Sequence, residues 1–273
     1  MNHFQLMPRS KKEKVMSSQP LKQPAPKSQH AKRVDAELAG LPREGKRTER
    51  EKLALAALIL ADEGHSGGLA GQLTAQIGPD RFLTLPLGTG FDEANADDML
   101  VVDDDLNVIE GRGIPNPATR FHLWIYRHKP NTRSIVHTHP PATSALSAIG
   151  QPLIIAHMDM CMFHDQCAYL PDWPGLPIGD EEGIVISGAL GERKTILLAN
   201  HGLITTGQSI EEAAYLAYFF ERAAALQLAA SASGTLRVVD PEKAHEAGAF
   251  LLKPKIVEMT FEYLARKAER RAR

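Results

Sequence analysis

Apolar residues follow helical and strand periods in alternation along most of the chain. A helical pattern begins at Thr48, where acidic residues precede a run of leucine, alanine and isoleucine that ends before Gly64. Residues 65–110 carry short apolar segments separated by glycine and aspartate turns, which is the pattern of short strands. These four strands are expected at 71–75, 81–85, 99–102 and 107–109.

The second half of the chain continues this alternation. Asn116-Pro117 is typical of a helix start, with Asn as the N-cap and Pro as the first helical residue. Ser209 and Glu212 have the spacing of a capping box ahead of a long apolar helix. Further strands are expected at 134–138, 153–158, 195–199 and 203–206, and further helices at 140–149, 181–190, 241–252 and 254–271. Intermixed strands and helices predict one α/β domain with helices on both sides of a mixed sheet.

The first 46 residues have a different composition. Lys, Pro, Ser and Gln predominate, and residues 1–34 contain eight Lys or Arg against one acid, Glu13. Such a segment buries too little surface to offset the entropy lost on ordering. We therefore expect a disordered basic arm at 1–46 and a single domain at 47–273, with C-terminal helices from about 241. The alternative to a solvated tail is an anionic docking tail or a targeting segment.

Composition narrows the class of protein. The chain has 273 residues and a formal net charge of −2, so it lacks the overall positive charge that would attract nucleic acid. The sequence contains no apolar run of membrane-spanning length and no secretory signal at its start. Two cysteines do not make a disulfide framework. We expect a cytoplasmic protein with neither nucleic-acid nor membrane partners.

Three histidines stand at the ends of predicted strands. Side chains alternate along a strand, so His137 and His139, at the end of 134–138, project from one face. His201 follows the strand 195–199. Three neutral imidazoles with an open position are typical of catalytic zinc and also suit other transition metals. For the H-x-H pair alone, packing or surface decoration is the alternative.

A second cluster of metal-ligating residue types is weaker. Cys161, His164 and Cys167 have the spacing C-x2-H-x2-C, but structural zinc needs four ligands and the sequence offers no distant partner pair. We interpret this segment as a loop with two free thiols. The glycines of 64–71 lack the spacing of a phosphate or dinucleotide loop, and predict either a turn close to a ligand or an ordinary turn.

Several motifs, in order, resemble the class II aldolase/adducin family. They are Arg120-Phe121-His122, then residues 135–141 around the H-x-H pair, residues 197–203 around His201, and residues 209–213. This family contains fuculose-phosphate-type aldolases, ribulose-phosphate 4-epimerases and the adducin head domain. The resemblance covers about residues 48–232.

The resemblance implies a fold and a cofactor. It implies a three-layer α/β/α domain with a central mixed sheet, assembled as a homotetramer with sites where subunits meet. It also implies one divalent ion, Zn²⁺ ahead of Fe²⁺, held by His137, His139 and His201. Such an ion polarises the carbonyl and hydroxyl of a small-molecule substrate and stabilises the charge that develops when a carbon–carbon bond breaks.

The sequence departs from this family at residues that bind phosphate and move protons. The family glutamate that acts as acid/base falls on Ala118, and a methyl group can do neither task. The paired serines become Asn116 and Pro117, and the other phosphate turn becomes Gly71-Gln72. Gly71, Gln72 and Asn116 are therefore the expected substrate-binding residues, and we expect a substrate that is not a sugar phosphate.

Three functions follow from this pattern. The first is a metal-dependent aldolase-like lyase acting on a small hydroxy-carbonyl compound, with Asp159 or His157 as the candidate catalytic acid/base. Either side chain could equally be an ordinary polar residue. The second is a non-haem iron(II) oxygenase or decarboxylase, and the third is a non-catalytic adducin-like interaction module. All three histidines are present in the sequence, which favours an enzyme.

Overall fold

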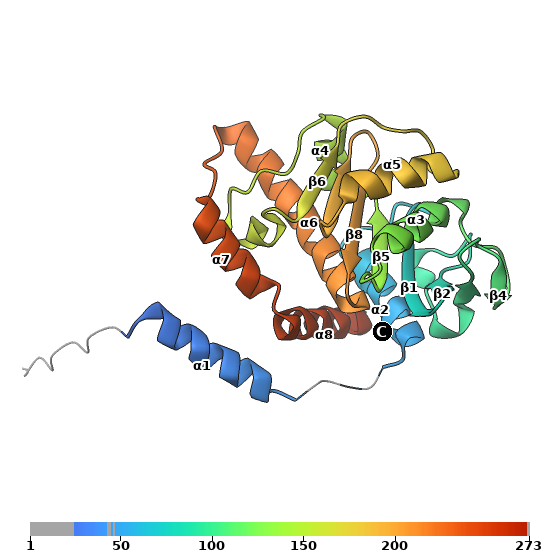
Figure 1. Ribbon diagram of the computed structural model, residues 1–273, viewed down its shortest axis with the longest axis horizontal. Coiled ribbons are helices and arrows are strands. Elements are labelled where there is room, and N and C mark those ends of the chain that lie inside the picture. Colours follow the sequence, from blue (N-terminus) through green and yellow to red (C-terminus); the bar gives the residue numbers. More distant parts are fainter. Residues whose placement is uncertain (1–24, 43–44, 46, 272–273) are drawn as a thin grey trace, which may run out of the picture. The chain divides into compact units, whose positions relative to one another are not determined.

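The computed structural model describes residues 25–42, residue 45 and residues 47–271 (Figure 1). Contacts divide the chain into two units between Pro42 and Arg43. The first unit contains helix α1, Lys27–Gly40. The second contains all the strands and the remaining helices, and each unit is described by itself.

Helix α1 corrects part of the expectation for the N-terminal arm. A disordered segment is wrong for Lys27–Gly40, which forms 14 residues of α-helix without burying any side chain. The segment is rich in helix formers, and Arg33 lies 3.6 Å from Glu37 one turn later. These local preferences support a helix where no core is present. The expectation for residues 1–24 lies outside the described residues.

The second unit is built on one eight-stranded mixed sheet. Its strand order is β4-β3-β2-β1-β5-β8-β7-β6, and only the β6–β7 pair is parallel among the described strands. The strands are β1 Gln72–Gly78, β2 Arg81–Thr84, β3 Leu100–Val102, β4 Val108–Glu110, β5 Ser134–Thr138, β6 Cys167–Leu170, β7 Thr195–Leu198 and β8 Leu203–Gly207.

Helices cover both faces of this sheet, which confirms the expected three-layer α/β/α fold. The α-helices are α2 Glu49–Asp62, α3 Arg120–His128, α4 Pro141–Ala148, α5 Asp180–Leu190, α6 Ile210–Ser233, α7 Pro241–Leu251 and α8 Pro254–Arg271. Short 3-10 helices are η1 Phe91–Glu93, η2 Ala96–Asp98, η3 Pro117–Thr119 and η4 Met158–Phe163. Successive residues of β5 join different cores: Val136 packs with α2, α6 and α8, and Ile135 packs with α3 and α5.

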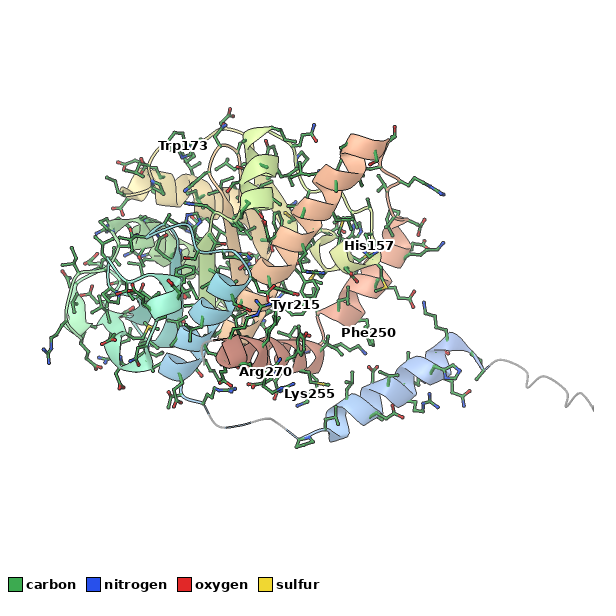
Figure 2. All side chains as sticks on the ribbon, turned by 180° about the vertical axis from the view of Figure 1, so that it is seen from behind. His157, Trp173, Tyr215, Phe250, Lys255 and Arg270 are labelled. Atoms are coloured by element: carbon green, nitrogen blue, oxygen red, sulfur yellow. The ribbon has the colours of Figure 1, made fainter. Side chains whose placement is uncertain are left out.

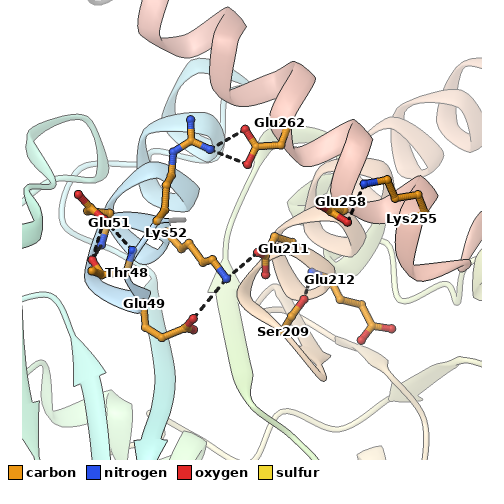
Figure 3. A network of polar contacts seen from close by, with 11 residues as sticks. Thr48, Glu49, Glu51, Lys52, Ser209, Glu211, Glu212, Lys255, Glu258 and Glu262 are labelled. Atoms are coloured by element: carbon orange, nitrogen blue, oxygen red, sulfur yellow. Dashed lines mark hydrogen bonds and ion pairs between the residues drawn. The ribbon is translucent and has the colours of Figure 1, made fainter. Parts of the chain in front are cut away.

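Charged contacts join the helices on the larger core. Lys52 of α2 lies 3.0 Å from Glu211 at the start of α6, and Arg47 donates to both carboxylate oxygens of Glu262 on α8 at 2.5 Å (Figure 3). Because these partners are largely shielded from water, the contacts stabilise the packing of α2 against the start of α6 and the middle of α8. Among the described helices, none combines the length and apolar character that crossing a bilayer requires.

One predicted strand is wrong and one strand was missed. Residues 153–158 form irregular chain ending in η4, although Leu153 and Ile155 pack against the core. Their backbone is paired by a side chain instead of a strand, because Gln227 of α6 accepts from the N–H of Ile154 and donates to the carbonyl of Pro152. The missed strand is β6, which occupies the sheet edge where a loop with two thiols was expected.

Candidate metal site

The three predicted histidines converge at one end of the sheet. His137 is in β5, His139 directly follows it, and His201 lies in the turn between β7 and β8. The pairing of β5 with β8 brings these segments together, and one ring nitrogen from each histidine lies within 4.8 Å of the others. Nε2 of His137 and Nε2 of His139 are 2.9 Å apart. This arrangement can place three nitrogen donors around one ion.

A hydrogen bond fixes the orientation of His137. Its Nδ1 donates to the carbonyl oxygen of Leu203 over 2.9 Å, and a carbonyl can only accept. The neutral ring therefore keeps its lone pair on Nε2, the atom that faces His139. Phe121 packs edge-on against the His137 ring with centroids 5.1 Å apart. Partners of this kind, which orient a ligand from behind, are typical of metal-binding histidines.

The turn that carries His201 has special backbone requirements on both sides. Asn200 adopts a left-handed conformation with φ of 55°, which asparagine tolerates better than most residues. Gly202 lies against His139, so that a Cβ at this position would stand 2.3 Å from Cδ2 of that ring. Local backbone chemistry thus explains why Asn and Gly flank His201.

Burial keeps the cluster in the neutral form that binds metal. Desolvation lowers the pKa of His137 well below its usual value, with the neighbouring His201 and His139 lowering it further. Burial also lowers the pKa of His139, and it lowers that of His201 to about 4 with a smaller contribution from His139. The buried Nδ1 of His201 has no hydrogen-bond partner among the described residues. Three neutral imidazoles and this unpaired nitrogen fit a divalent transition metal.

The three expected substrate-binding residues come together beside this cluster. Gly71, Gln72 and Asn116 line one cavity. Gln72 faces His137 across the β1–β5 pair, and a Cβ on Gly71 would stand 2.9 Å from the carbonyl oxygen of His137 and 3.1 Å from the Phe91 ring. Their role in substrate binding stays a prediction, to which the shared cavity adds support.

His157 and Asp159 lie elsewhere on the chain. They are exposed at the start of η4, 3.7 Å from each other. Trp173 lies next to the histidine cluster, with its ring centroid 6.4 Å from that of His201, and so shows where the cluster is in Figure 2. Figure 2 shows His157 well separated from Trp173. Within one chain the structure therefore does not bring His157 to the histidine cluster, and an acid/base role for either residue stays a prediction.

The segment that the resemblance aligns with the family glutamate begins with a polar cap, two residues before Ala118. Asn116 accepts a hydrogen bond from the backbone N–H of Ala118 over 3.0 Å. It is the N-cap of η3, and α3 follows from Arg120. The expected helix start at Asn116 is therefore a 3-10 turn. Ala118 packs against the core shared with α3 and α5.

Two buried histidines next to the cluster were not singled out from the sequence. His65 bonds through Nδ1 to the hydroxyl of Thr138, the residue between the two H-x-H histidines, and His122 bonds to Thr74. Burial lowers the pKa of each to about 3. For His122, its place in the Arg-Phe-His motif was the sequence signal that could have identified it. For His65, the only such signal was the glycine-rich segment around it.

The second cysteine–histidine cluster is not assembled. Cys161 is buried in η4, where its Sγ lies 3.5 Å from the carbonyl oxygen of His157, and Cys167 begins β6. Among the described residues, the histidine triad is the one group of three or more His, Cys, Asp or Glu side chains with metal-ligand geometry. Both cysteines are free thiols, as expected.

A three-layer α/β/α domain with three convergent histidines defines the class of the protein. Residues 51–228 match the Class II Aldolase and Adducin N-terminal domain, and the chain belongs to this family. The Meiotically up-regulated gene 14 protein of Schizosaccharomyces pombe is 28% identical over 77% of this chain and 86% of its own length. Decarboxylase NovR of Streptomyces niveus is 30% identical over 66% and 68%. The structure of L-fuculose 1-phosphate aldolase from Glaciozyma antarctica PI12 superposes with a TM-score of 0.75 and 28% identity, covering 86% of this chain and 96% of that one.

Proposed function

We propose that this protein is a metal-dependent lyase of the class II aldolase type, in which His137, His139 and His201 hold one divalent ion. The observation that carries the proposal is the convergence of three neutral imidazoles, one of them fixed by Leu203 with its lone pair toward the others. Zn²⁺ is the ion we favour, because three histidines with an open position are typical of its catalytic sites.

The substrate we propose is a small hydroxy-carbonyl compound without a phosphate. When bound, the ion supplies Lewis-acid polarisation of the substrate oxygens. The chain holds its imidazoles neutral through burial, and Gly71, Gln72 and Asn116 offer backbone and amide contacts in the adjoining cavity. The described residues that line this cavity include no Lys, Arg or His, which are the usual partners of a phosphate dianion.

A second candidate function is an iron(II)-dependent decarboxylase or oxygenase. The similarity to a protein named Decarboxylase NovR favours it, and three histidine nitrogens also suit Fe²⁺. The family also includes adducin domains, so a non-catalytic interaction module is the third candidate. The complete histidine cluster argues against this module, because the buried Nδ1 of His201 would be costly to retain without a ligand.

Metal analysis of the untagged protein purified without oxygen distinguishes these candidates. About one zinc per chain supports the lyase, and about one iron supports the decarboxylase or oxygenase. Metal content near zero that divalent ions do not restore contradicts both and supports the interaction module. Activity is then assayed with the metal that the protein carries.

We extend the proposal to assembly and location. By resemblance to its family, the protein is proposed to form a homotetramer in the cytoplasm, with sites where subunits meet. Sedimentation at several protein concentrations tests the tetramer. A monomer that still binds about one metal per chain would contradict the tetramer and leave the metal site intact.

A further inference from the structure

A tryptophan side chain stands beside the histidine cluster without being buried. Trp173 lies in the loop between β6 and α5 and is 50% exposed. Its indole centroid is 6.4 Å from that of the His201 ring, with the two planes inclined at 56°. The same loop exposes Leu176 by 64% and Ile178 by 53%. Large apolar side chains exposed in one loop are typical of a surface that contacts something apolar, and Trp173 places part of this loop beside His201.

Apolar side chains also border the cluster on the side of His137. The cavity that contains Gly71 is lined by Leu69, Leu87 and Phe91, and the Phe91 ring lies within 3.1 Å of a Cβ built on Gly71. Gly71 in turn abuts the carbonyl of His137. The polar cluster is thus bordered by apolar groups at both His137 and His201.

The distance between the rings leaves the indole available to a ligand. Aromatic rings interact at centroid separations of about 4.5–7 Å, so Trp173 stands at the outer part of this range from His201. Half of its surface remains in solvent.

We infer that Trp173 forms an aromatic subsite, which binds a planar unsaturated or aryl substituent next to the hydroxy-carbonyl group of the substrate. This inference rests on the proposed metal-dependent function and specifies the class of substrate. Trp173 is in this view a specificity-determining residue. It adds affinity through stacking and exclusion of water and takes no part in proton transfer.

Two hydroxamates test the subsite with the zinc-loaded, full-length protein. Acetohydroxamate and benzohydroxamate chelate a metal through the same two oxygens and differ only in methyl against phenyl. We expect the wild type to bind benzohydroxamate about tenfold more tightly in calorimetric titrations. Trp173→Ala should remove this preference while acetohydroxamate affinity changes less than about twofold, and Trp173→Phe should keep most of it.

Controls separate the possible failures. Trp124→Phe, which removes the other tryptophan of the chain, should keep the preference for the phenyl compound. Acetohydroxamate binding by Trp173→Ala shows that the variant is folded and metal-loaded. Equal binding of both hydroxamates by the wild type, or a preference that survives Trp173→Ala, overturns the aromatic subsite alone. If zinc-loaded wild type binds neither compound, the metal-dependent function fails and the subsite fails with it.

Discussion

Gly202 leaves no room for a side chain against His139. A Cβ at position 202 would stand 2.3 Å from Cδ2 of the His139 ring and 2.7 Å from the carbonyl oxygen of Thr138. Real carbon atoms do not approach so closely, so either the ring or the turn after β7 must move. The glycine next to His201 therefore determines where a different histidine of the cluster lies.

Gly202→Ala should lower metal affinity while the protein remains folded. The added methyl displaces the His139 ring, and losing the support of a ligand commonly costs about 10- to 100-fold in affinity. The free energy of unfolding should fall by about 1–3 kcal/mol from overpacking. Gly188→Ala is the matched control, because a Cβ there meets no atom within 4 Å. Competition with a fluorescent zinc chelator measures the affinity, and equal values for the two variants would contradict this role of Gly202.

Single substitution of each histidine should abolish stoichiometric metal binding. His137→Ala, His139→Ala and His201→Ala each leave two nitrogen donors, too few for a stable mononuclear site. Cys161→Ser and Cys167→Ser should retain about one metal per chain, because these thiols lie outside the cluster. His245→Ala, at an exposed position on α7, controls for loss of any histidine. Metal retained by a triad variant and lost from a cysteine variant would reverse the assignment.

The buried histidines should make the metal-free protein labile to acid. His122 is fully buried and its pKa falls to about 3, whereas in the unfolded chain it titrates near 6.5. The folded state therefore binds fewer protons than the unfolded state below pH 6.5. Stability is present above that pH and is lost as pH falls toward 3, by about 1.4 kcal/mol per pH unit for this one group.

Removing His122 should flatten this pH dependence. Between pH 6.5 and 5.0, His122→Asn should lose about 2 kcal/mol less of its unfolding free energy than the wild type does. Urea unfolding in the presence of a chelator measures both proteins. His245→Asn, at an exposed position, should behave like the wild type. An identical pH slope for His122→Asn and wild type would show that His122 is protonated in the folded protein.

The N-terminal unit should be dispensable for folding of the second unit. Helix α1 buries no side chain, whereas Arg47 is held by the Glu262 carboxylate at 2.5 Å. Deleting residues 1–42 should leave the melting temperature unchanged within about 2 °C. Arg47→Ala in the full chain should cost about 1–2 kcal/mol, since it breaks the charge-assisted hydrogen bonds from one guanidinium nitrogen to both carboxylate oxygens of Glu262. A large fall in melting temperature after the deletion would mean that residues 1–42 pack on the second unit or on a neighbouring subunit.

Local periodicity in the sequence was sufficient to predict most helices and strands. It was insufficient where contacts with residues distant in the sequence determine the local structure. The strand at Ser134–Thr138 and the capped helix after Ser209 were predictable, because their signals lie within a few residues. The irregular chain at 153–158 was not, because Gln227 pairs its backbone from 73 residues away. Helix α1 was missed for the opposite reason, since its local preferences outweigh its lack of a core.

The sequence allowed the residues of the candidate site to be predicted, but not the way in which they come together in space. Strand alternation places His137 and His139 on one face, but only the β5–β8 pairing brings His201 to them. The contact between His65 and Thr138 joins residues 73 positions apart, and no periodic pattern in the sequence indicates it. Trp173 stood in a proline-rich loop, and its position beside His201 became visible only in three dimensions.

The protein should fail as a sugar-phosphate aldolase even with its metal bound. The resemblance aligns the family's acid/base glutamate and paired serines with Asn116–Ala118, a segment that contains neither a carboxylate nor a hydroxyl. Asn116 instead caps the N–H of Ala118 over 3.0 Å, and the methyl of Ala118 cannot move a proton. Losing a general acid/base commonly costs about 100- to 10,000-fold in rate. Losing serine donors to a phosphate dianion costs about 1.5–3 kcal/mol for each hydrogen bond.

These losses should compound, because one acts on the chemical step and the other on binding. The amide of Asn116 can still donate one hydrogen bond, since its cap uses only the side-chain oxygen. Turnover of fuculose-phosphate and ribulose-phosphate by the metal-loaded protein should therefore stay near background. Coupled assays measure it, with an active L-fuculose 1-phosphate aldolase as the positive control and metal analysis of the same sample as the check on loading. Robust turnover of either compound would contradict this prediction, since another carboxylate would then have to serve in place of the one missing at Ala118.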